Sequence, residues 1–258
     1  MKYNYEFEIK YQEVDGEKRL RLFNLENYLL EVAGLVADDL GFGIAVLHPR
    51  GLTWILTRLS VEMYELPTHC QKVRFETWIE SNVHMLSTRD YRIYAEESKR
   101  DRACQKSKAG SQESNSNEWR LIGQCKSVWA VLDMEKREIV NCFNDPIFEG
   151  CVDGEVIEMS RIRMTTIPEP TGIVPHKVVY SDIDYNRHCN SCKYLQAMTD
   201  AYLPDYYGKK VRLDINYSKE AMLGETLQTC YLVTEDGVQY QQKNEAGETS
   251  CSAKITIN

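Results

Sequence analysis

The spacing of apolar residues predicts two amphipathic helices, one in each half of the chain. From Asn24, the stretch NLENYLLEVAGLVADDLG repeats apolar residues at helical spacing on one face: Tyr28, Leu29, Val32, Leu35 and Val36. A stretch from Asn190 repeats the spacing with Tyr194, Leu195, Met198, Ala201 and Tyr202. Each stretch begins with an asparagine suited to an N-cap. Each also ends near a glycine suited to terminate a helix, Gly41 or Gly208.

Strand patterns follow each helix. Residues 59–79 and 213–233 both read as strand, short turn, strand, and two further alternating stretches follow in each half. A short strand precedes each helix. Because a long amphipathic helix needs a sheet face on which to bury its apolar stripe, the pattern predicts an α+β fold. Each half would be a helix packed on a curved antiparallel sheet, and the two halves would form an intramolecular pseudo-dimer.

This repeat divides the chain into two domains and a linker. We expect a first domain over residues 1–140, a linker over 141–172, and a second domain over 173–258. The linker is irregular and relatively rich in proline. Residues 96–118 form a second irregular stretch, polar and poor in strand formers, which predicts a mobile hairpin loop.

Composition narrows the classes of function. The net charge of −8 over 258 residues argues against a nucleic-acid-binding protein, because no basic surplus is available to neutralise phosphates. No stretch is apolar enough to span a membrane. The N-terminus alternates like a strand and lacks the apolar core of a signal peptide, so we expect a cytoplasmic protein.

The cysteines favour reduced thiols. There are nine, without the spacing of a disulfide framework. Cys189 and Cys192 form a C-x-x-C beside His188, but the other histidines stand alone in the sequence. We therefore expect these two cysteines to be small buried residues at the start of a helix, and we predict no metal site.

The stretch SDIDYNRHCNSCKYL contains the strongest candidate for chemistry. It places Asp184, Asn186 and His188 at alternate positions. Alternate residues of an extended segment point the same way, so the three side chains would converge on one surface. A carboxylate, an amide and an imidazole can together orient a water and polarise a carbonyl. A polar surface turn that contains one histidine is the alternative reading of such a short motif.

The internal repeat indicates one site per chain. If the helical stripes are aligned, the first-half partners of Asp184, Asn186 and His188 are Lys18, Leu20 and Leu22. The triad would then not be duplicated, and the first half would be scaffold and pocket wall. Glu220 stands where the first half has Leu66. A carboxylate at an otherwise apolar position needs a partner or a function, although it could also cap an exposed strand end.

The chain resembles the acyl-ACP thioesterases of bacteria and plants, which have a tandem hot-dog fold. The second half contains the D-x-N-x-H-x-N pattern of that family, ending at Asn190, then a tyrosine at Tyr194 and a Y-x-x-E from Tyr217 to Glu220. First-half landmarks are W-x-L-x-R at Trp54–Arg58, the TW of Thr77 and Trp78, the RD of Arg89 and Asp90, and W-x-x-L-D at Trp129–Asp133.

The resemblance implies a set of catalytic roles and no metal or organic cofactor. Glu220 and His188 would hold and deprotonate the attacking water. Asn186 would donate to the thioester carbonyl, and Asp184 would orient Asn186 or the start of the helix. Direct attack by a carboxylate stays open. Plant members have a cysteine after the glutamate, but Ala221 stands here, so that cysteine cannot be the nucleophile.

The resemblance also implies a substrate pocket and a partner. We expect the acyl chain to lie between the first helix and its sheet, near Val32, Val36 and Trp54. The partner would be acyl carrier protein, which is acidic, so docking would need a local basic surface. The basic residues nearest the motif in sequence are candidates, or ordinary solvated charges: Arg187, Lys193, Lys209, Lys210 and Arg212. A monomer and a homodimer are both compatible with a tandem fold.

Three other functions compete with this hypothesis. The first is an acyl-CoA thioesterase. The second is a hot-dog hydratase or dehydratase, but these use D-x-N-P-x-H, with a proline and a histidine one residue farther from the aspartate than His188 is from Asp184. The third is a non-catalytic acyl-binding module, for which the loss of Asp184 or Glu220 would have been evidence; both are present.

Overall fold

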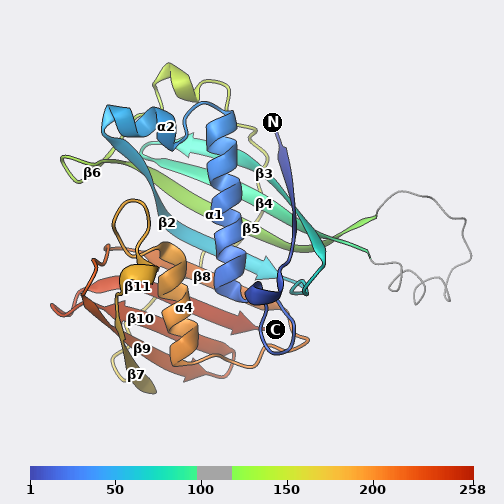
Figure 1. Cartoon of the computed structure of the whole chain (residues 1–258), viewed down its shortest axis with the longest axis vertical. Coiled ribbons are helices and arrows are strands. Elements are labelled where there is room, and N and C mark those ends of the chain that lie inside the picture. Colours follow the sequence, from blue (N-terminus) through green and yellow to red (C-terminus); the bar gives the residue numbers. More distant parts are fainter. Residues whose placement is uncertain (98–117) are drawn as a thin grey trace, which may run out of the picture.

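One antiparallel sheet contains all the strands of the described residues, 1–97 and 118–258, of this computed structural model (Figure 1). The first half supplies β1 (Tyr3–Glu8), β2 (Leu52–Met63), β3 (Lys72–Val83), β4 (Leu86–Glu96), β5 (Trp119–Asp133) and β6 (Glu138–Val140). The second half supplies β7 (Gly172–Lys177), β8 (Val211–Tyr217), β9 (Thr226–Thr234), β10 (Gly237–Lys243) and β11 (Thr249–Ile257). Their order is β1-β3-β4-β5-β2-β8-β11-β10-β9-β7, and β6 pairs with β5.

The two halves meet where β2 pairs with β8. The antiparallel register runs from Arg58 opposite Asn216 to Met63 opposite Val211. Leu59 lies opposite Ile215, and Val61 lies opposite Leu213, so the junction repeats itself under exchange of the halves. The predicted pseudo-dimer is therefore a single continuous sheet with an approximate two-fold relation at its centre.

Two long helices cover the same face of this sheet, one over each half (Figure 1). They are α1 (Leu22–Asp39) and α4 (Ser191–Ala201), and their apolar stripes are buried against the strands. Leu29, Leu195 and Met198 are fully buried. Short helices make the remaining turns: η1 (Tyr11–Glu13), α2 (Ile44–Leu47), η2 (His48–Arg50), η3 (Pro146–Phe148) and η4 (Tyr180–Asp182). Together with the shared antiparallel sheet, this arrangement confirms the predicted tandem hot-dog architecture.

The helix ends correct parts of the sequence prediction. Asn190 is the N-cap of α4, where its side chain accepts from the backbone N–H of Cys192 at 3.0 Å. Asn24 is not an N-cap, because α1 already begins at Leu22 and the Asn24 amide donates to the Glu13 carbonyl. The second helix stops at Ala201 rather than near Gly208. Pro204 accounts for this end, because proline disfavours helical backbone in the residue before it.

The segment between the halves packs across the sheet face opposite the helices. The Trp78 indole donates to the Glu155 carbonyl at 2.8 Å, and the backbone N–H of Ile157 donates to Asp90 at 2.8 Å. Farther along, Ser160 contacts Arg212 of β8. The predicted linker therefore runs from the outer face of one half to the other. The predicted loop 96–118 falls almost wholly outside the described residues.

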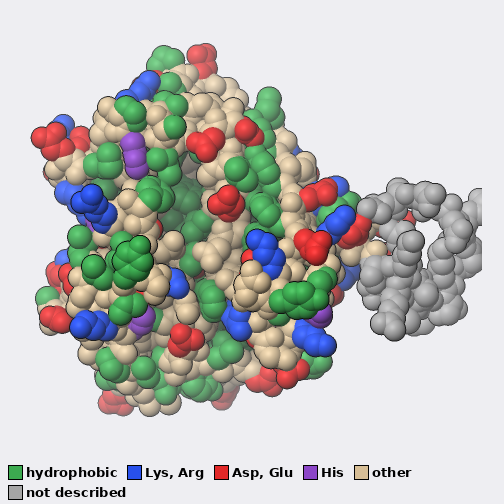
Figure 2. Space-filling view, in the orientation of Figure 1, with side chains coloured by type: hydrophobic (Ala, Val, Ile, Leu, Met, Phe, Trp, Pro, Cys, Tyr) green, Lys and Arg blue, Asp and Glu red, His purple; other side chains and the backbone are tan. Residues whose placement is uncertain are grey.

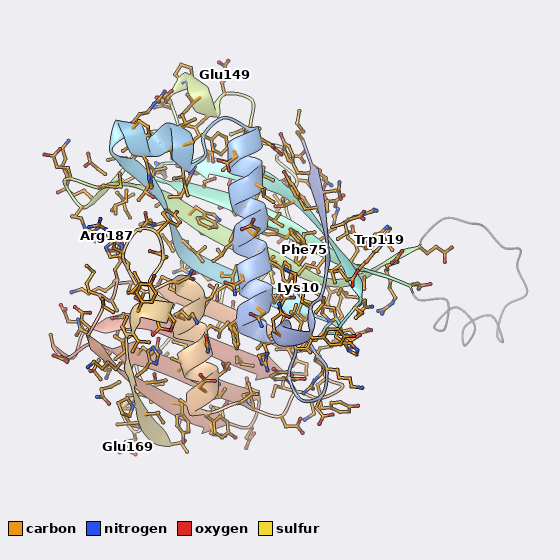
Figure 3. The ribbon with its side chains drawn as sticks, viewed as in Figure 1. Lys10, Phe75, Trp119, Glu149, Glu169 and Arg187 are labelled. Atoms are coloured by element: carbon orange, nitrogen blue, oxygen red, sulfur yellow. The ribbon has the colours of Figure 1, made fainter. Side chains whose placement is uncertain are left out.

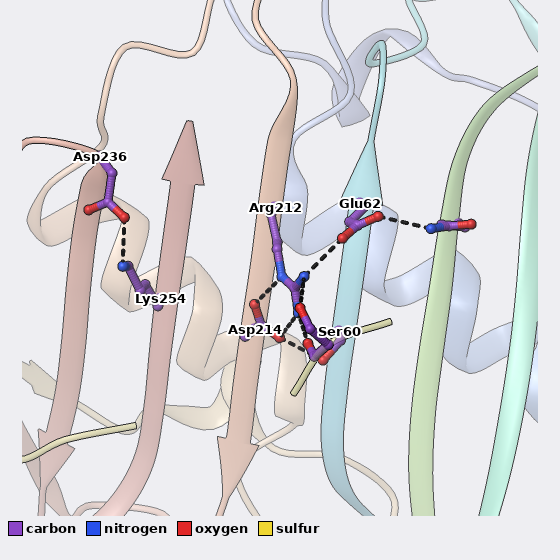
Figure 4. A network of polar contacts seen from close by, with 8 residues as sticks. Ser60, Glu62, Arg212, Asp214, Asp236 and Lys254 are labelled. Carbon is purple, nitrogen blue, oxygen red and sulfur yellow. Dashed lines mark hydrogen bonds and ion pairs between the residues drawn. The ribbon is translucent and has the colours of Figure 1, made fainter. Parts of the chain in front are cut away.

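A polar network lies on that outer face at the junction (Figure 4). Arg212 bonds Asp214 on its own strand and Glu62 on β2, and Ser60 donates to Asp214 at 2.7 Å. The bonds to Asp214 and the charge of the two carboxylates raise the pKa of Arg212. Because both charges of the Arg212–Asp214 pair are largely buried, loss of one partner would leave the other uncompensated.

Candidate active site

A cavity of about 930 Å³ lies beside α1 and extends to the loop before α4. In the space-filling view this face is hollowed beside α1, and hydrophobic side chains line the hollow (Figure 2). The sequence-predicted Asp184, Asn186, His188 and Glu220 all border the cavity, so the structure brings all four together. The opposite wall comes from the first half, including α1, β2 and β5.

The loop before α4 is organised by Asp184. Its carboxylate accepts from the backbone N–H groups of Asn186 at 2.8 Å and His188 at 3.2 Å. The backbone of Asp184 and His188 pairs as well, and Arg187 turns the chain with a φ of 66°. Asp184 therefore fixes the backbone that presents Asn186 and His188. It orients the loop, as an aspartate does in an Asx turn.

The first half contains the same loop, which the sequence alignment did not reveal. Asp15 accepts from the backbone N–H groups of Glu17 and Arg19, each at 2.9 Å, and Lys18 turns the chain with a φ of 64°. Asp184, Asn186 and His188 thus correspond to Asp15, Glu17 and Arg19. The predicted partners Lys18, Leu20 and Leu22 were wrong. The aspartate is duplicated as part of the loop, whereas the amide and the imidazole are not.

The alignment failed for a simple geometric reason. The correct register differs from the predicted one by three residues, which is close to one helical turn. A helical stripe looks nearly the same after such a shift, so it cannot select between the two registers. The predicted alignment of the strands, by contrast, was correct. Successive side chains of a strand point to opposite faces and only one face is buried, so a shift of one residue would be recognised. Leu20 donates its backbone N–H to the carbonyl of Pro67, as Cys189 does to that of Ala221, so Glu220 corresponds to Leu66.

Glu220 is held next to this loop by its neighbours. The Cys189 N–H donates to the Ala221 carbonyl at 2.8 Å, and the Ala221 N–H donates to the Tyr194 hydroxyl at 2.8 Å. Tyr217, at the end of β8, donates its hydroxyl to Glu26 of α1. Burial raises the pKa of Glu26 to about 7. The strand end that leads to Glu220 is therefore tied to both helices.

His188 and Glu220 face each other. His188 Nδ1 lies 3.4 Å from Glu220 Oε1, and the guanidinium of Arg137 bonds the other carboxylate oxygen. Partial burial, with the positive charge of Arg137, lowers the pKa of His188 below its ordinary value. The imidazole is therefore neutral near pH 7 and able to accept a proton.

Sequence reasoning missed Arg137. It lies in the turn between β5 and β6, far from the motif in sequence, and no pattern there marks it as part of a site. Its backbone has a φ of 59°, which is uncommon for a residue other than glycine, but this angle is visible only in the structure. Arg137 reaches the cavity because the sheet junction brings the first half against the end of β8.

Of the three residues expected to contact the acyl chain, one lines the cavity and two do not. Trp54 lines the cavity, where its indole donates to the Phe42 carbonyl at 3.0 Å. Val32 and Val36 do not line it; both are fully buried in the contacts between α1 and the sheet. The cavity meets the adjacent face of α1 instead, at residues that include Leu30, Gly34 and Leu35. Four residues of the predicted stripe are therefore on the core side of the helix, and Leu35 alone of the five is on the cavity side.

The expected docking residues do not form one surface. Figure 3 shows Arg187 exposed on the loop before α4, next to the site. Lys193 bonds Gln196 along α4. Arg212 belongs to the outer-face network and is largely buried. Lys209 and Lys210 precede β8, so the length of that strand, about 20 Å, separates them from Glu220 at its other end.

The two cysteines of the C-x-x-C are buried free thiols. Both are buried, and burial raises the pKa of Cys189 to about 12 and that of Cys192 well above its ordinary value. A thiolate is the reactive form, so neither side chain is prepared for nucleophilic or redox chemistry. Among residues 1–97 and 118–258, no group of three or more His, Cys, Asp and Glu side chains could hold a metal ion.

Comparison with known proteins assigns the family. The model for the acyl-ACP thioesterase N-terminal domain matches residues 1–107, and the model for the C-terminal domain of that family matches residues 169–258. The chain belongs to the acyl-ACP thioesterase family. Within the described residues, no helix has the length and apolarity needed to cross a membrane.

Proteins similar to this chain include thioesterases of known structure and a curated plant thioesterase. A crystal structure of an acyl-ACP thioesterase from Bacteroides thetaiotaomicron is 27% identical, with a TM-score of 0.80, over 100% of this chain and 98% of that one. The 12:0-ACP thioesterase from Umbellularia californica shares the fold at 17% identity and a TM-score of 0.77, over 100% and 96% of the two chains.

A curated palmitoyl-acyl carrier protein thioesterase of Arabidopsis thaliana is 24% identical over 97% of this chain. The match covers 59% of that relative's length, so this chain spans about three fifths of it. The relative is described as chloroplastic, and the cytoplasmic location of this chain stays a prediction.

The duplicated loop gives a matched pair of variants. Asp184→Ala and Asp15→Ala each remove a carboxylate that accepts two backbone N–H groups, which should lower the free energy of unfolding by about 1–2 kcal/mol. Asp15→Ala should lower it further, because Asp15 also pairs with the side chain of Arg19. Only Asp184→Ala should also abolish thioester hydrolysis, because only its loop carries Asn186 and His188. Urea denaturation and free-thiol release measure the two effects. Equal activity in the two folded variants would contradict the assignment.

Proposed function

We propose that this protein hydrolyses fatty acyl–acyl carrier protein thioesters and releases the free fatty acid. The observation that supports this most strongly is the approach of His188 and Glu220, from separate segments, to 3.4 Å on the wall of a cavity of about 930 Å³. A base beside a carboxylate on the wall of a largely apolar cavity suits the cleavage of an acyl thioester. Family membership supports the same substrate class.

The proposed reaction uses water as the nucleophile. His188 and Glu220 hold the water, and the neutral imidazole accepts its proton as the oxygen attacks the thioester carbon. Asn186, on the same cavity wall, donates to the carbonyl oxygen as negative charge develops on it. Collapse of the tetrahedral intermediate breaks the carbon–sulfur bond, and the departing thiolate recovers the proton. Arg137 holds the second oxygen of Glu220 and keeps its charge directed toward the site.

In the proposed complex, the carrier protein docks around the loop before α4. Arg187 is the basic residue of the expected set that is exposed beside the catalytic groups. An acidic carrier would be attracted there, and the attraction would weaken as salt is added. Lys209 and Lys210 lie beyond the far end of β8, so we expect them to lie outside the docking surface.

Removal of the water-binding pair should abolish most activity. His188→Ala and Glu220→Gln should each lower kcat/KM for acyl-ACP by about 10²–10⁴-fold, the usual contribution of a general base. Cys189→Ala is the control, and it should retain activity because its thiol is buried and protonated. Retention of near-wild-type turnover by either site variant, in a folded protein, would refute the proposed mechanism.

The pH profile should report the lowered pKa of His188. Activity requires the neutral imidazole, so kcat/KM should fall on acidification with a midpoint below pH 6.5, the ordinary value for histidine. Arg137→Met removes a positive charge that disfavours the imidazolium, so the midpoint should move to higher pH. Lys136→Met, in the same turn but paired with Asp133, is the control and should not move it. A midpoint unaffected by Arg137→Met would contradict the pairing.

Docking can be tested with charge variants at the two ends of β8. Arg187→Asp should raise KM for acyl-ACP at low salt by about three- to tenfold, as expected for reversal of one exposed charge, and leave a small acyl thioester unaffected. Aspartate tolerates the positive φ at this position. Lys209→Glu with Lys210→Glu should change neither value. The opposite result would place the carrier at the other end of the strand. A matched acyl-CoA series would show whether the carrier is required.

A further inference from the structure

Arg89 is a buried cation on the wall of the cavity. It lies on β4, opposite Ile79 of β3 and Ser127 of β5, and its side chain is on the sheet face that α1 covers. Only 4% of its surface is exposed. Ser87, two residues earlier on the same face, is also buried and also lines the cavity. This end of a mostly apolar cavity therefore contains a charged donor and a hydroxyl.

No partner compensates Arg89 within residues 1–97 and 118–258. Its Nη1 is buried without an acceptor, and no ion pair of its guanidinium is found among those residues. The ionisable side chains that act on it most strongly are Tyr91, Cys151, Tyr3 and Tyr5, and none of them is a carboxylate. Burial lowers the pKa of Arg89, as expected for a cation removed from water.

Other buried charges of the sheet are paired, which sets Arg89 apart. Asp90, the next residue on β4, faces outward and bonds Lys126, and the buried Asp214 bonds Arg212. A buried charge without a partner is costly, and proteins rarely keep one without a use. Here the unpaired donors border an open cavity, so a bound molecule could supply the missing acceptor.

Arg89 lies in the part of the cavity that the far end of a bound acyl chain would reach. Glu220 follows β8, and three strand spacings separate β8 from β4 in the order β8-β2-β5-β4. At about 4.8 Å per spacing, Arg89 lies about 14 Å across the sheet from the strand that leads to the catalytic carboxylate. An acyl chain whose thioester lies at His188 and Glu220 could extend along the cavity toward Arg89.

We propose that Arg89, with Ser87, forms a subsite for an oxygen-bearing group on the distal part of the acyl chain. A terminal hydroxyl or carboxylate would accept from the guanidinium, and a carboxylate would also neutralise it. A terminal methyl group would leave the cation unpaired and would deprive it of any remaining water. This inference rests on the proposed thioesterase function and identifies the class of acyl group that its cavity favours.

Matched acyl-ACP substrates test the subsite. At each of several chain lengths, three acyl groups are compared: one ending in methyl, one in hydroxyl and one in carboxylate. For the wild-type protein, kcat/KM at the best length should be about tenfold higher for an oxygenated end than for methyl, the scale of one charge-assisted hydrogen bond. The hydroxyl and carboxylate arms show which oxygen group is preferred. The wild-type comparison needs no variant to fold.

Variants then connect the preference to Arg89. Arg89→Met should reverse the preference in favour of methyl, and Arg89→Lys should retain part of it. Arg92→Met is the control, since Arg92 lies on the same strand but pairs with Glu76 and Glu155 on the outer face. A wild-type preference for methyl at every length, or the same ratio in folded Arg89→Met, would overturn the subsite. Absence of hydrolysis of all three wild-type substrates would instead overturn the proposed function.

Discussion

The pairing of β2 with β8 is the constraint on which the rest of the structure depends. This one strand pair joins the two halves, and its register fixes where the end of β8 meets the first half. Glu220 follows that end, and Arg137 reaches it from the turn after β5. A slip of one residue would exchange the buried and outer faces of β8. The Arg212, Asp214 and Glu62 network on the outer face opposes such a slip, because it would lose its partners.

The two halves share a backbone but differ in chemistry. Both loops are held by an aspartate, Asp15 or Asp184, in the same hydrogen-bonding pattern. In the first half, however, the position of His188 is taken by Arg19, which pairs with Asp15 and lies over the rings of two tyrosines, Tyr206 and Tyr207.

The helices of the two halves also differ, both in length and in how they border the cavity. α1 has 18 residues and walls the cavity along its length, whereas α4 has 11 and ends before it could form an equivalent wall. The approximate symmetry therefore explains the architecture, and the departures from it explain why the proposed catalytic groups are assembled only once in the described structure.

The sequence predicted the elements better than their relative placement. Apolar periodicity identified both helices and the repeat, because burial of a stripe on a sheet is the dominant local requirement. It could not identify Asp15 as the counterpart of Asp184, since a shift of one helical turn preserves the stripe. The motif placed His188 near Asn186, but Arg137 and Arg89 enter the cavity only through strand pairing. Lys209 and Lys210 are close to the motif in sequence but lie at the opposite end of β8 from Glu220, and their part in docking stays a prediction.

The central claim is that one site per chain binds the acyl-ACP thioester, formed by the second-half loop against the first-half helix. The most direct measurement is calorimetric titration of the protein with a non-hydrolysable thioether analogue of acyl-ACP. The account predicts one equivalent bound per chain, with binding unaffected when the first-half loop is altered by Arg19→Leu. Two equivalents per chain, or loss of binding in folded Arg19→Leu, would contradict it.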